Sequence, residues 1–332
     1  MLNPVHVAVR SLLSERHLHP VLIDVGASGP TPPVWDPIAP LSCYIGFDPD
    51  SREMAEINDG QFHRTTIVNE AVTCEADAST AIFYLTRSPF CSSTLPPDAT
   101  GLSNYIFSDL FEIEREVEVR ATTLNAVIER LRLTCVDWLK LDTQGTDLRL
   151  YKSLSDETRS HVLAVDAEPG LIDAYQGEDL FVETHATFVR EGFWLSDILV
   201  KGAIRMGRTT LGEALKRQPM LDENTLTNTL KPAPGWCEAR YLRSLESLAR
   251  NNAGERDYLL LWAFALIDGQ TGFAYEVGLE FERRFPRDCH AQRLAAEAGH
   301  LMHLQCMKPP FAARLKTFVP GPLKRVLKRV IQ

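Results

Sequence analysis

The sequence predicts an α/β protein with a mostly parallel, doubly wound sheet, a late antiparallel strand and a C-terminal helical region. Three observations support this. Strand-like and helix-like runs alternate from residue 21 to about 200, three of the apolar runs end in an aspartate, and the pattern becomes helical from about residue 246. Such alternation is typical of parallel strands joined by crossover helices.

The first strand lies in VLIDVGASG, residues 21–29, where an apolar run leads through Asp24 into a tight turn. The turn consists of Gly26, Ala27, Ser28 and Gly29. Glycine has no side chain, so the backbone can adopt positive φ there and approach a ligand closely. We expect this turn to contact a nucleotide.

The second strand, CYIGFDPD at residues 43–50, ends in Asp48 and Asp50, both of which we expect to bind the cofactor. Asp48 follows Asp24 by 24 residues, about the spacing that brings an acid to a ribose diol in dinucleotide enzymes and in S-adenosylmethionine (SAM) methyltransferases. A pyrophosphate site requires G-x-G-x-x-G, whereas the turn here reads GASGPTPP. This favours a ligand that has no pyrophosphate.

A further strand, in VDWLKLDTQGTD at residues 136–147, ends in Asp142, and Gln144, which we expect to bind the cofactor, lies in the loop beyond it. In open α/β sheets, ligands bind outside the carboxyl ends of the strands. Asp24, Asp48 and Asp142 are therefore expected to converge on one crevice, although each one alone also fits the N-cap of a following helix.

The order of the motifs resembles that of FkbM-type methyltransferases. The resemblance covers roughly residues 20–245, and LKLDTQG with its spacing to the first glycine turn is its specific part. The matching strings are DVGASG, GFDPD, VNEAV, SST, TTLNAVI, LKLDTQGTDLRLYKSL, AVDAEPGLIDAYQGEDLFVETHATFVREGFWLSDI and WCEARYLR. The resemblance implies a Rossmann-like class I methyltransferase fold and SAM-dependent O-methylation of a glycan or another small hydroxyl compound.

The resemblance also implies roles for individual residues. The motif of Asp24, Gly26 and Ala27 would hold the methionine portion of SAM, the acid matched by Asp48 would take the ribose, and Asn69 would lie near the adenine.

Asp142 matches the family residue beside the sulfonium and the acceptor. A carboxylate there can act as general base for the acceptor hydroxyl. Asp142 is the first candidate, Glu168 at the next strand end the second and His63 the third. Ser92 and Ser93, in the loop after AIFYLT, are expected either to bind the ligand or to form a turn.

The chain departs from the family pattern at Pro30, where many members have Gly, and at Asp48 and Asp147, where most have Glu. Pro30 suits the first position of a following helix. Two alternatives to the enzyme are a SAM-binding or degenerate methyltransferase-fold scaffold in polysaccharide assembly and a nicotinamide oxidoreductase. The strand-end acids that are present argue against the first and the missing dinucleotide fingerprint against the second.

The composition predicts a cytoplasmic globular protein. The 332 residues, 45% of them hydrophobic, suffice for a large α/β domain with a small companion. The seven cysteines contain no C-x-x-C pair and indicate reduced, mostly buried thiols. The first twenty residues lack a signal-peptide core, and the apolar run 258–267 is too short for a bilayer and is expected to be a buried helix.

We expect a methyltransferase domain over 1–245, with an insertion at about 202–235 that is a candidate acceptor lid, and a helical region over 246–332 whose first long helix breaks at Asp268 and Gly269. The cluster of Cys289, His290, His300, His303 and Cys306 is interpreted as an ordinary helix face, with no metal site.

The end of the chain, residues 305–332, has seven Lys or Arg residues and no acid. Leu323, Val326, Leu327, Val330 and Ile331 form an apolar stripe opposite its cations. This predicts a basic amphipathic helix that either packs on the protein or contacts an anionic membrane surface. Nucleic acid is not expected, because the rest of the chain is acidic.

Overall fold

The computed structural model describes residues 3–50 and 60–307 and divides into two compact units, Met1–Gln270 and Thr271–Gln332. The first unit includes the helices α9 (Leu245–Arg250) and α10 (Glu255–Ile267). The sequence pattern placed these two helices with the C-terminal region, and the exact end of the methyltransferase domain stays a prediction.

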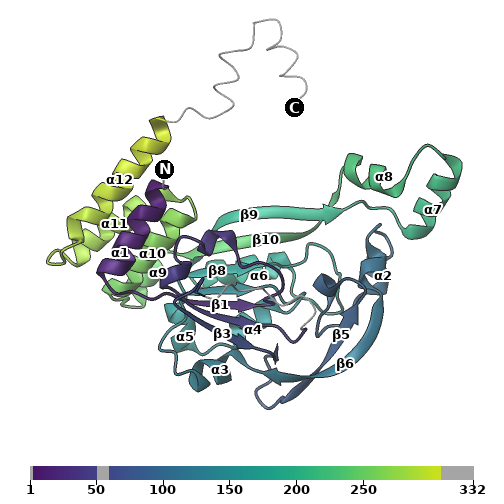
Figure 1. Cartoon of the computed structure of the whole chain (residues 1–332), viewed down its shortest axis with the longest axis horizontal. Coiled ribbons are helices and arrows are strands. Elements are labelled where there is room, and N and C mark those ends of the chain that lie inside the picture. Colours follow the sequence, from purple (N-terminus) through teal and green to yellow (C-terminus); the bar gives the residue numbers. More distant parts are fainter. Residues whose placement is uncertain (1–2, 51–59, 308–332) are drawn as a thin grey trace, which may run out of the picture. The chain divides into compact units, whose positions relative to one another are not determined.

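The first unit is built on a seven-stranded sheet in the order β3-β2-β1-β7-β8-β10-β9, as seen among the described residues (Figure 1). The first five strands in this order are parallel, and β10 runs antiparallel to both of its neighbours. The strands are β1 (Val21–Val25), β2 (Cys43–Phe47), β3 (Arg64–Val68), β7 (Trp138–Leu141), β8 (Ala164–Ala167), β9 (Phe193–Ala203) and β10 (Ala233–Arg243). The predicted α/β fold with a late antiparallel strand is confirmed, and its strand order is that of a class I methyltransferase.

The sheet reverses its winding at β1, which pairs with β2 on one side and with β7 on the other. In this register Asp24 lies opposite Gly46 on β2 and opposite Lys140 on β7. Such a switch point opens a crevice at the carboxyl ends of the strands. The aspartates that follow these ends are thereby placed around one opening.

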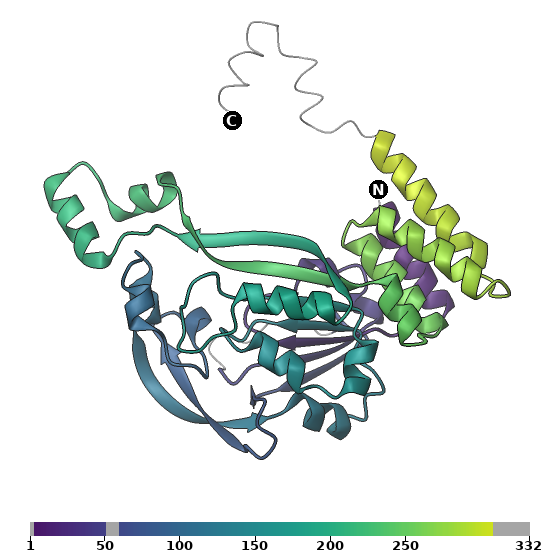
Figure 2. The ribbon, with the colours of Figure 1, turned by 180° about the vertical axis from the view of Figure 1, so that it is seen from behind.

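Helices cover both faces of the sheet. On one face, side chains of α3 (Leu124–Arg130), α4 (Asp147–Ser153) and α6 (Phe181–Arg190) join a continuous apolar core with β1, and α6 packs against β9 and β10 (Figure 2). On the other face, α10 (Glu255–Ile267) places Phe264 against Trp138, with ring centroids 4.9 Å apart. The same face packs α1 (Pro4–Glu15) against α10.

Helix α10 is the buried helix predicted at 258–267. Its residues 257–266 are all buried. Arg256 also donates two hydrogen bonds, of 2.6 and 2.7 Å, to the fully buried carboxylate of Asp137 just before β7. A helix that is apolar all round requires cover on every side. This explains why α10 belongs to the first unit, after the short helix α9 (Leu245–Arg250).

A second, three-stranded sheet in the order β4-β6-β5 lies between β3 and β7 in the chain. Its strands are β4 (Ala71–Val72), β5 (Thr80–Thr86) and β6 (Ile113–Thr122). The connection from β5 to β6 contains the short helices η3 (Pro89–Cys91), α2 (Ala99–Leu102) and η4 (Ser108–Phe111). The remaining short elements are η1 (Pro33–Trp35), η2 (Ala39–Leu41) and α5 (Asp156–His161).

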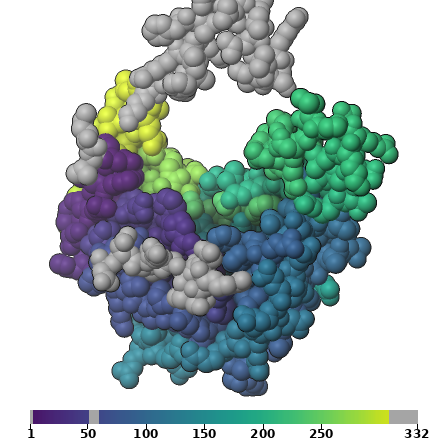
Figure 3. Space-filling view, turned by 45° about the vertical axis from the view of Figure 1, so that its right-hand side comes forward, coloured from purple at the N-terminus to yellow at the C-terminus, as the bar shows by residue number. Residues whose placement is uncertain are grey.

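The predicted insertion is a helical arm between β9 and β10, consisting of α7 (Arg208–Arg217) and α8 (Glu223–Thr229). Figure 3 shows this green segment beside the blue segment that contains α2. Ile204, Leu211 and Leu226 of the arm form a small core with Ile106. The amide of Ile106 donates to the carbonyl of Ile204 over 3.0 Å, so the arm is fastened to the loop after α2.

The second unit contains α11 (Thr271–Arg284) and α12 (Ala291–Met307), which pack along each other. The predicted break is confirmed, because α10 ends before Asp268 and Gly269 has a φ of +78°. The basic stripe from Leu323 to Ile331 lies outside the described residues. Among the helices of 3–50 and 60–307, none combines the length and apolar character needed to cross a bilayer.

Two smaller expectations are wrong. No α-helix begins at Pro30; the described chain instead forms a 3₁₀ turn from Pro33, because consecutive prolines restrict the backbone before it. The thiols are also less buried than predicted. Only Cys237 is buried, whereas Cys74, Cys289 and Cys306 are exposed.

Candidate active site

One cavity of 710 Å³ lies at the carboxyl ends of β1, β2, β7 and β8. It extends from the turn after β1 to residues of the arm and of β10. Of the predicted site residues, those that line it are Gly26, Ser28, Asp48, Asp50, Ser92, Asp142, Gln144 and Glu168. The crevice predicted from the acidic strand ends is therefore present, and its volume lies within the range usual for ligand pockets.

Gly26 brings the ends of β1 and β7 into direct contact. Its φ is +82°, and a Cβ at this position would lie 1.9 Å from the carbonyl oxygen of Asp142. The amides of Gly26 and Ala27 both donate to the carbonyl of Phe47, each over 2.9 Å. No side chain fits between these strand ends, so the backbone itself forms the floor of the cavity there.

Asp48 lies at the end of β2 and is 6% exposed. Its Oδ1 accepts a 2.7 Å hydrogen bond from the amide of Asp50. Burial raises the pKa of Asp48 to about 6, against the effect of this hydrogen bond. Nearby, Phe47, Val72 and Phe83 form an apolar wall of the cavity. A carboxylate that can accept from a diol, beside an apolar slot, fits the ribose and adenine of SAM.

Asp24 does not line the cavity. It is 2% exposed, and its two oxygens accept from Lys140 Nζ over 2.8 Å and from the Tyr44 hydroxyl over 3.1 Å. Lys140 Nζ lies 3.8 Å from Asp142 Oδ2 and 3.4 Å from the carbonyl of Gly26. The structural task of Asp24 is thus to bind the partly buried Lys140 ammonium group beside the ends of β1 and β7.

The other predicted residues outside the cavity lining are Ala27, Gly29, Asn69, Ser93 and His63. Asn69 is exposed, although its neighbours Glu70 and Ala71 line the cavity. Ser93 donates to the carbonyl of Gln144 over 2.8 Å and so supports the loop after β7. His63 stacks on His19, with ring centroids 4.1 Å apart.

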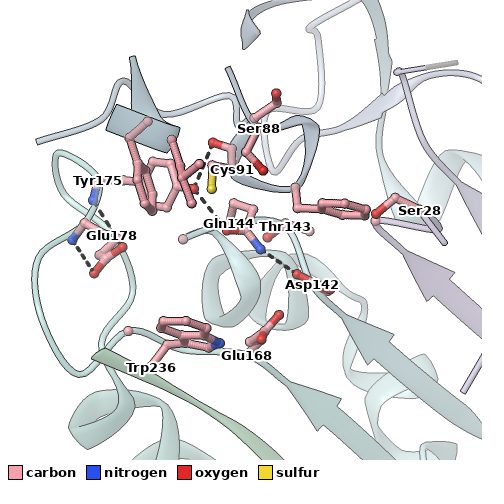
Figure 4. Close-up of a pocket in the computed structure, with 18 of the residues that line it drawn as sticks. Ser28, Ser88, Cys91, Asp142, Thr143, Gln144, Glu168, Tyr175, Glu178 and Trp236 are labelled. Atoms are coloured by element: carbon pink, nitrogen blue, oxygen red, sulfur yellow. Dashed lines mark hydrogen bonds between the residues drawn. The ribbon is translucent and has the colours of Figure 1, made fainter. Parts of the chain in front are cut away.

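Asp142 and Glu168 form an acidic pair in the cavity (Figure 4). Glu168 hydrogen-bonds to the Asp142 side chain, and burial, together with the Asp142 charge, raises the pKa of Glu168 to about 9. Glu168 is therefore protonated at neutral pH and can donate a hydrogen bond. Asp142, the first candidate for the general base, can accept this hydrogen bond.

Gln144 and Tyr175 orient Asp142. Gln144 Nε2 donates to Asp142 Oδ1 over 2.7 Å, and the Tyr175 hydroxyl lies 3.0 Å from Gln144 Oε1 (Figure 4). Gln144 adopts a φ of +56°, which its side-chain contacts and the Ser93 bond support. Gln144 was predicted to bind the cofactor, and the structure places it against Asp142.

Asp147 joins the ends of β7 and β8. It is 2% exposed and accepts from the Thr143 amide over 3.0 Å, from the Thr143 hydroxyl over 2.6 Å and from the Glu168 amide over 2.8 Å. Asp147, one of the positions at which this chain departs from the family pattern, thus connects the two strand ends.

Sequence reasoning missed Lys140, Tyr175 and Trp236. Lys140 was detectable, because a charged residue within the apolar run WLKL indicates a buried partner. Tyr175 and Trp236 lie in a loop and in a late strand, where nothing in the local pattern distinguishes them.

A separate group in the second unit consists of Asp288, Cys289 and His290, whose candidate ligand atoms lie within 4.8 Å of one another. The three residues are consecutive, and the Cys289 thiol lies 3.1 Å from His290 Nδ1. His300, His303 and Cys306 are not part of this group in the described chain.

The strand order, the switch-point cavity and the acid at the end of β2 define a SAM-dependent methyltransferase. The family comparison agrees: residues 43–188 match the model described as Methyltransferase FkbM domain, so the chain carries an FkbM methyltransferase domain. The match begins at β2 and ends in α6, so β1, β9, the arm and β10 lie outside it. Comparisons with curated proteins and with solved structures gave no significant match.

Proposed function

We propose that the protein transfers the methyl group of SAM to a hydroxyl of a glycan or another small-molecule acceptor. The observation that carries this proposal is the continuity of one cavity from Gly26 and Asp48, at the donor end, to Glu168 and Trp236 at the other. Methyl transfer requires donor and acceptor in line within one water-shielded space. A cavity of 710 Å³ with both ends lined by polar groups suits this arrangement.

The donor end offers a place for each part of SAM. Asp48 accepts from the ribose hydroxyls, the wall of Phe47, Val72 and Phe83 covers the adenine, and the backbone at Gly26 allows the methionine portion to approach. When bound, SAM supplies a methyl group on a positively charged sulfur.

At the acceptor end, Asp142 accepts the proton of the hydroxyl as the new carbon–oxygen bond forms and the methyl–sulfur bond breaks, so that S-adenosylhomocysteine is the leaving group. Gln144 and Tyr175 keep this carboxylate turned toward the cavity, and protonated Glu168 donates a hydrogen bond beside it. General-base assistance of this kind contributes about 10² to 10⁴ in rate.

The basic C-terminal stripe supports a second element of the proposal. A helix with cations opposite an apolar stripe binds anionic membrane surfaces reversibly. Contact through this segment would bring the cytoplasmic enzyme to acceptors presented at a membrane.

The roles of the acidic pair are tested with two conservative variants and a panel of hydroxyl acceptors. Asp142→Asn should lower methyl transfer by about 10² to 10⁴ because its amide cannot take the proton. Glu168→Gln keeps a hydrogen-bond donor and should cost less than about tenfold. Transfer of labelled methyl from SAM measures both, with S-adenosylhomocysteine affinity as the control for folding.

The opposite ranking of the two variants would make Glu168 the base. If Asp142→Asn loses SAM affinity but retains turnover at saturating SAM, Asp142 is a binding residue and the proposed mechanism is wrong.

A further inference from the structure

The acceptor end of the cavity has a wall of four aromatic rings, which we call the aromatic wall. Neighbouring rings lie 5.3 to 6.2 Å apart between centroids. In order along the wall they are Trp236, Phe107, Phe111 and Tyr175, and all four line the cavity. They come from β10, from the segment at η4 and from the loop after β8. Three distant parts of the chain therefore combine into one apolar surface.

Trp236 is only partly buried, and its indole ring lies beside Glu168 with the ring nitrogen turned toward that side chain (Figure 4). An indole N–H that stays accessible can donate a hydrogen bond to a ligand. No hydrogen bond joins the Trp236 ring nitrogen to the other residues drawn in Figure 4. The wall thus offers a ring face and a hydrogen-bond donor at the same place.

The charged side chains that line the whole cavity are acidic in the part of the chain that the structure describes. They are Asp48, Asp50, Glu70, Asp142, Glu168, Glu178 and Glu238, and no Lys, Arg or His is among the described lining residues. At the acceptor end, a carboxylate or phosphate of the acceptor would lose water without gaining a cation from these lining residues. The acceptor end therefore disfavours anions.

The acidic groups at the acceptor end are nevertheless already engaged. Glu178 accepts from the amides of Ala174 and Tyr175 over 3.0 and 3.2 Å. Glu238 is paired with Lys201. Glu168 is hydrogen-bonded to Asp142 and protonated at neutral pH, because burial raises its pKa to about 9. This leaves hydrogen-bonding groups beside the wall, with little uncompensated charge to hold a cation.

A ligand suited to this end is uncharged, has hydroxyl groups along one edge and has an apolar face. Aromatic rings carry partial negative charge on their faces, so polarised C–H groups pack well on them. Pyranose rings combine such a C–H face with an equatorial edge of hydroxyls. The C–H face of one sugar ring can therefore pack on the aromatic wall while its hydroxyl groups hydrogen-bond to Asp142 and Glu168.

We propose that the acceptor end binds a neutral sugar ring, with its C–H face on Trp236 and its hydroxyl edge toward Asp142 and Glu168, and that it rejects sugars bearing a carboxylate or phosphate. This proposal rests on the proposed function, because it names the acceptor class of the same cavity.

Saturation-transfer NMR on the full chain with bound S-adenosylhomocysteine tests the proposal. The probes are the methyl glycosides of glucose, galactose and mannose, together with the methyl glycoside of glucuronic acid. At least one neutral glycoside should receive saturation, strongest on one face of the ring. The glucuronoside should show binding at least about tenfold weaker than the matching glucoside.

Trp236→Ala should abolish saturation transfer to the neutral sugar, and Trp236→Phe should restore part of it, while S-adenosylhomocysteine affinity stays within about twofold. Tyr275→Ala in the second unit is the matched control and should change nothing.

The proposal is overturned if the glucuronoside binds as well as the glucoside, if no neutral glycoside binds, or if Trp236→Ala leaves sugar binding intact. Failure to bind S-adenosylhomocysteine at all would instead overturn the proposed function. The affinity for S-adenosylhomocysteine is measured apart from sugar binding, so the two outcomes can be distinguished.

Discussion

At the scale of single residues, burial decides what each acid of the cavity can do. Asp24 and Asp147 are almost completely enclosed and bind other parts of the chain. Asp48 and Asp142 each have an oxygen in a hydrogen bond with the protein and still line the cavity. Residue type alone therefore predicted that acids would gather here, whereas their separate tasks depend on neighbours from other strands.

The pKa of Asp48, raised to about 6 by burial, predicts a pH dependence of donor binding. The carboxylate accepts from a ribose diol only when ionised, so affinity should fall as the pH drops below about 6. Between pH 6 and pH 5, the dissociation constant of S-adenosylhomocysteine should rise by about fivefold, because the ionised fraction of a group with a pKa of about 6 falls by that factor.

Isothermal titration at a series of pH values measures this effect. Asp48→Asn is the matched control: its affinity should be lower at pH 8 and should lack the added loss below pH 6. Parallel pH profiles for the two proteins would assign the titration to another group.

At the scale of elements, the arm between β9 and β10 supplies the acceptor end. Ile204, Thr227 and Pro232 of the arm line the cavity beside Gly202 of β9, and the arm forms a small core with Ile106. This position of the arm at the cavity is consistent with the acceptor lid predicted at about 202–235. Its role in acceptor binding stays a prediction.

The arm can be removed without disturbing the strands that bear it, because Ala203 and Ala233 are cross-strand partners. Replacing residues 204–232 with Asn-Gly would close the hairpin with a two-residue turn. Affinity for S-adenosylhomocysteine should change less than about threefold, and acceptor turnover should fall by about 10² or more, since the arm forms part of the acceptor end.

Leu221→Ser, at a partly exposed position of the arm outside the cavity lining, is the control and should retain turnover. Full turnover without the arm would show that the acceptor binds elsewhere. Loss of S-adenosylhomocysteine binding by a folded protein would assign the arm to the donor end.

At the scale of the whole molecule, the sheet and its switch point could be predicted because each strand has a recognisable local sequence pattern. VLIDV and WLKL are apolar runs, and the acid that follows such a run lies at the strand end whatever the distant chain does. Helix α10 was predictable for the same reason, since a run that is apolar throughout must be buried.

The rest could not be predicted because it depends on contacts between residues far apart in the sequence. Lys140 donates a hydrogen bond to Asp24, which lies 116 positions earlier in the sequence. The rings of the aromatic wall come from three separate segments of the chain. The helix predicted to begin at Pro30 was wrong for a related reason. A proline suits the first position of a helix, but the prolines that follow Pro30 allow only a 3₁₀ turn. Local pattern locates the strand ends, and packing determines which of their side chains face the cavity.

The central claim is that the cavity at the ends of β1, β2 and β7 binds SAM, and calorimetry with S-adenosylhomocysteine and NAD tests it most directly. The full chain should bind one S-adenosylhomocysteine and no NAD. Asp48→Ala should weaken that binding by roughly 1.5 to 3 kcal/mol through loss of a charge-assisted hydrogen bond to the ribose. Binding of NAD in place of S-adenosylhomocysteine, or an unchanged affinity in Asp48→Ala, would contradict the claim.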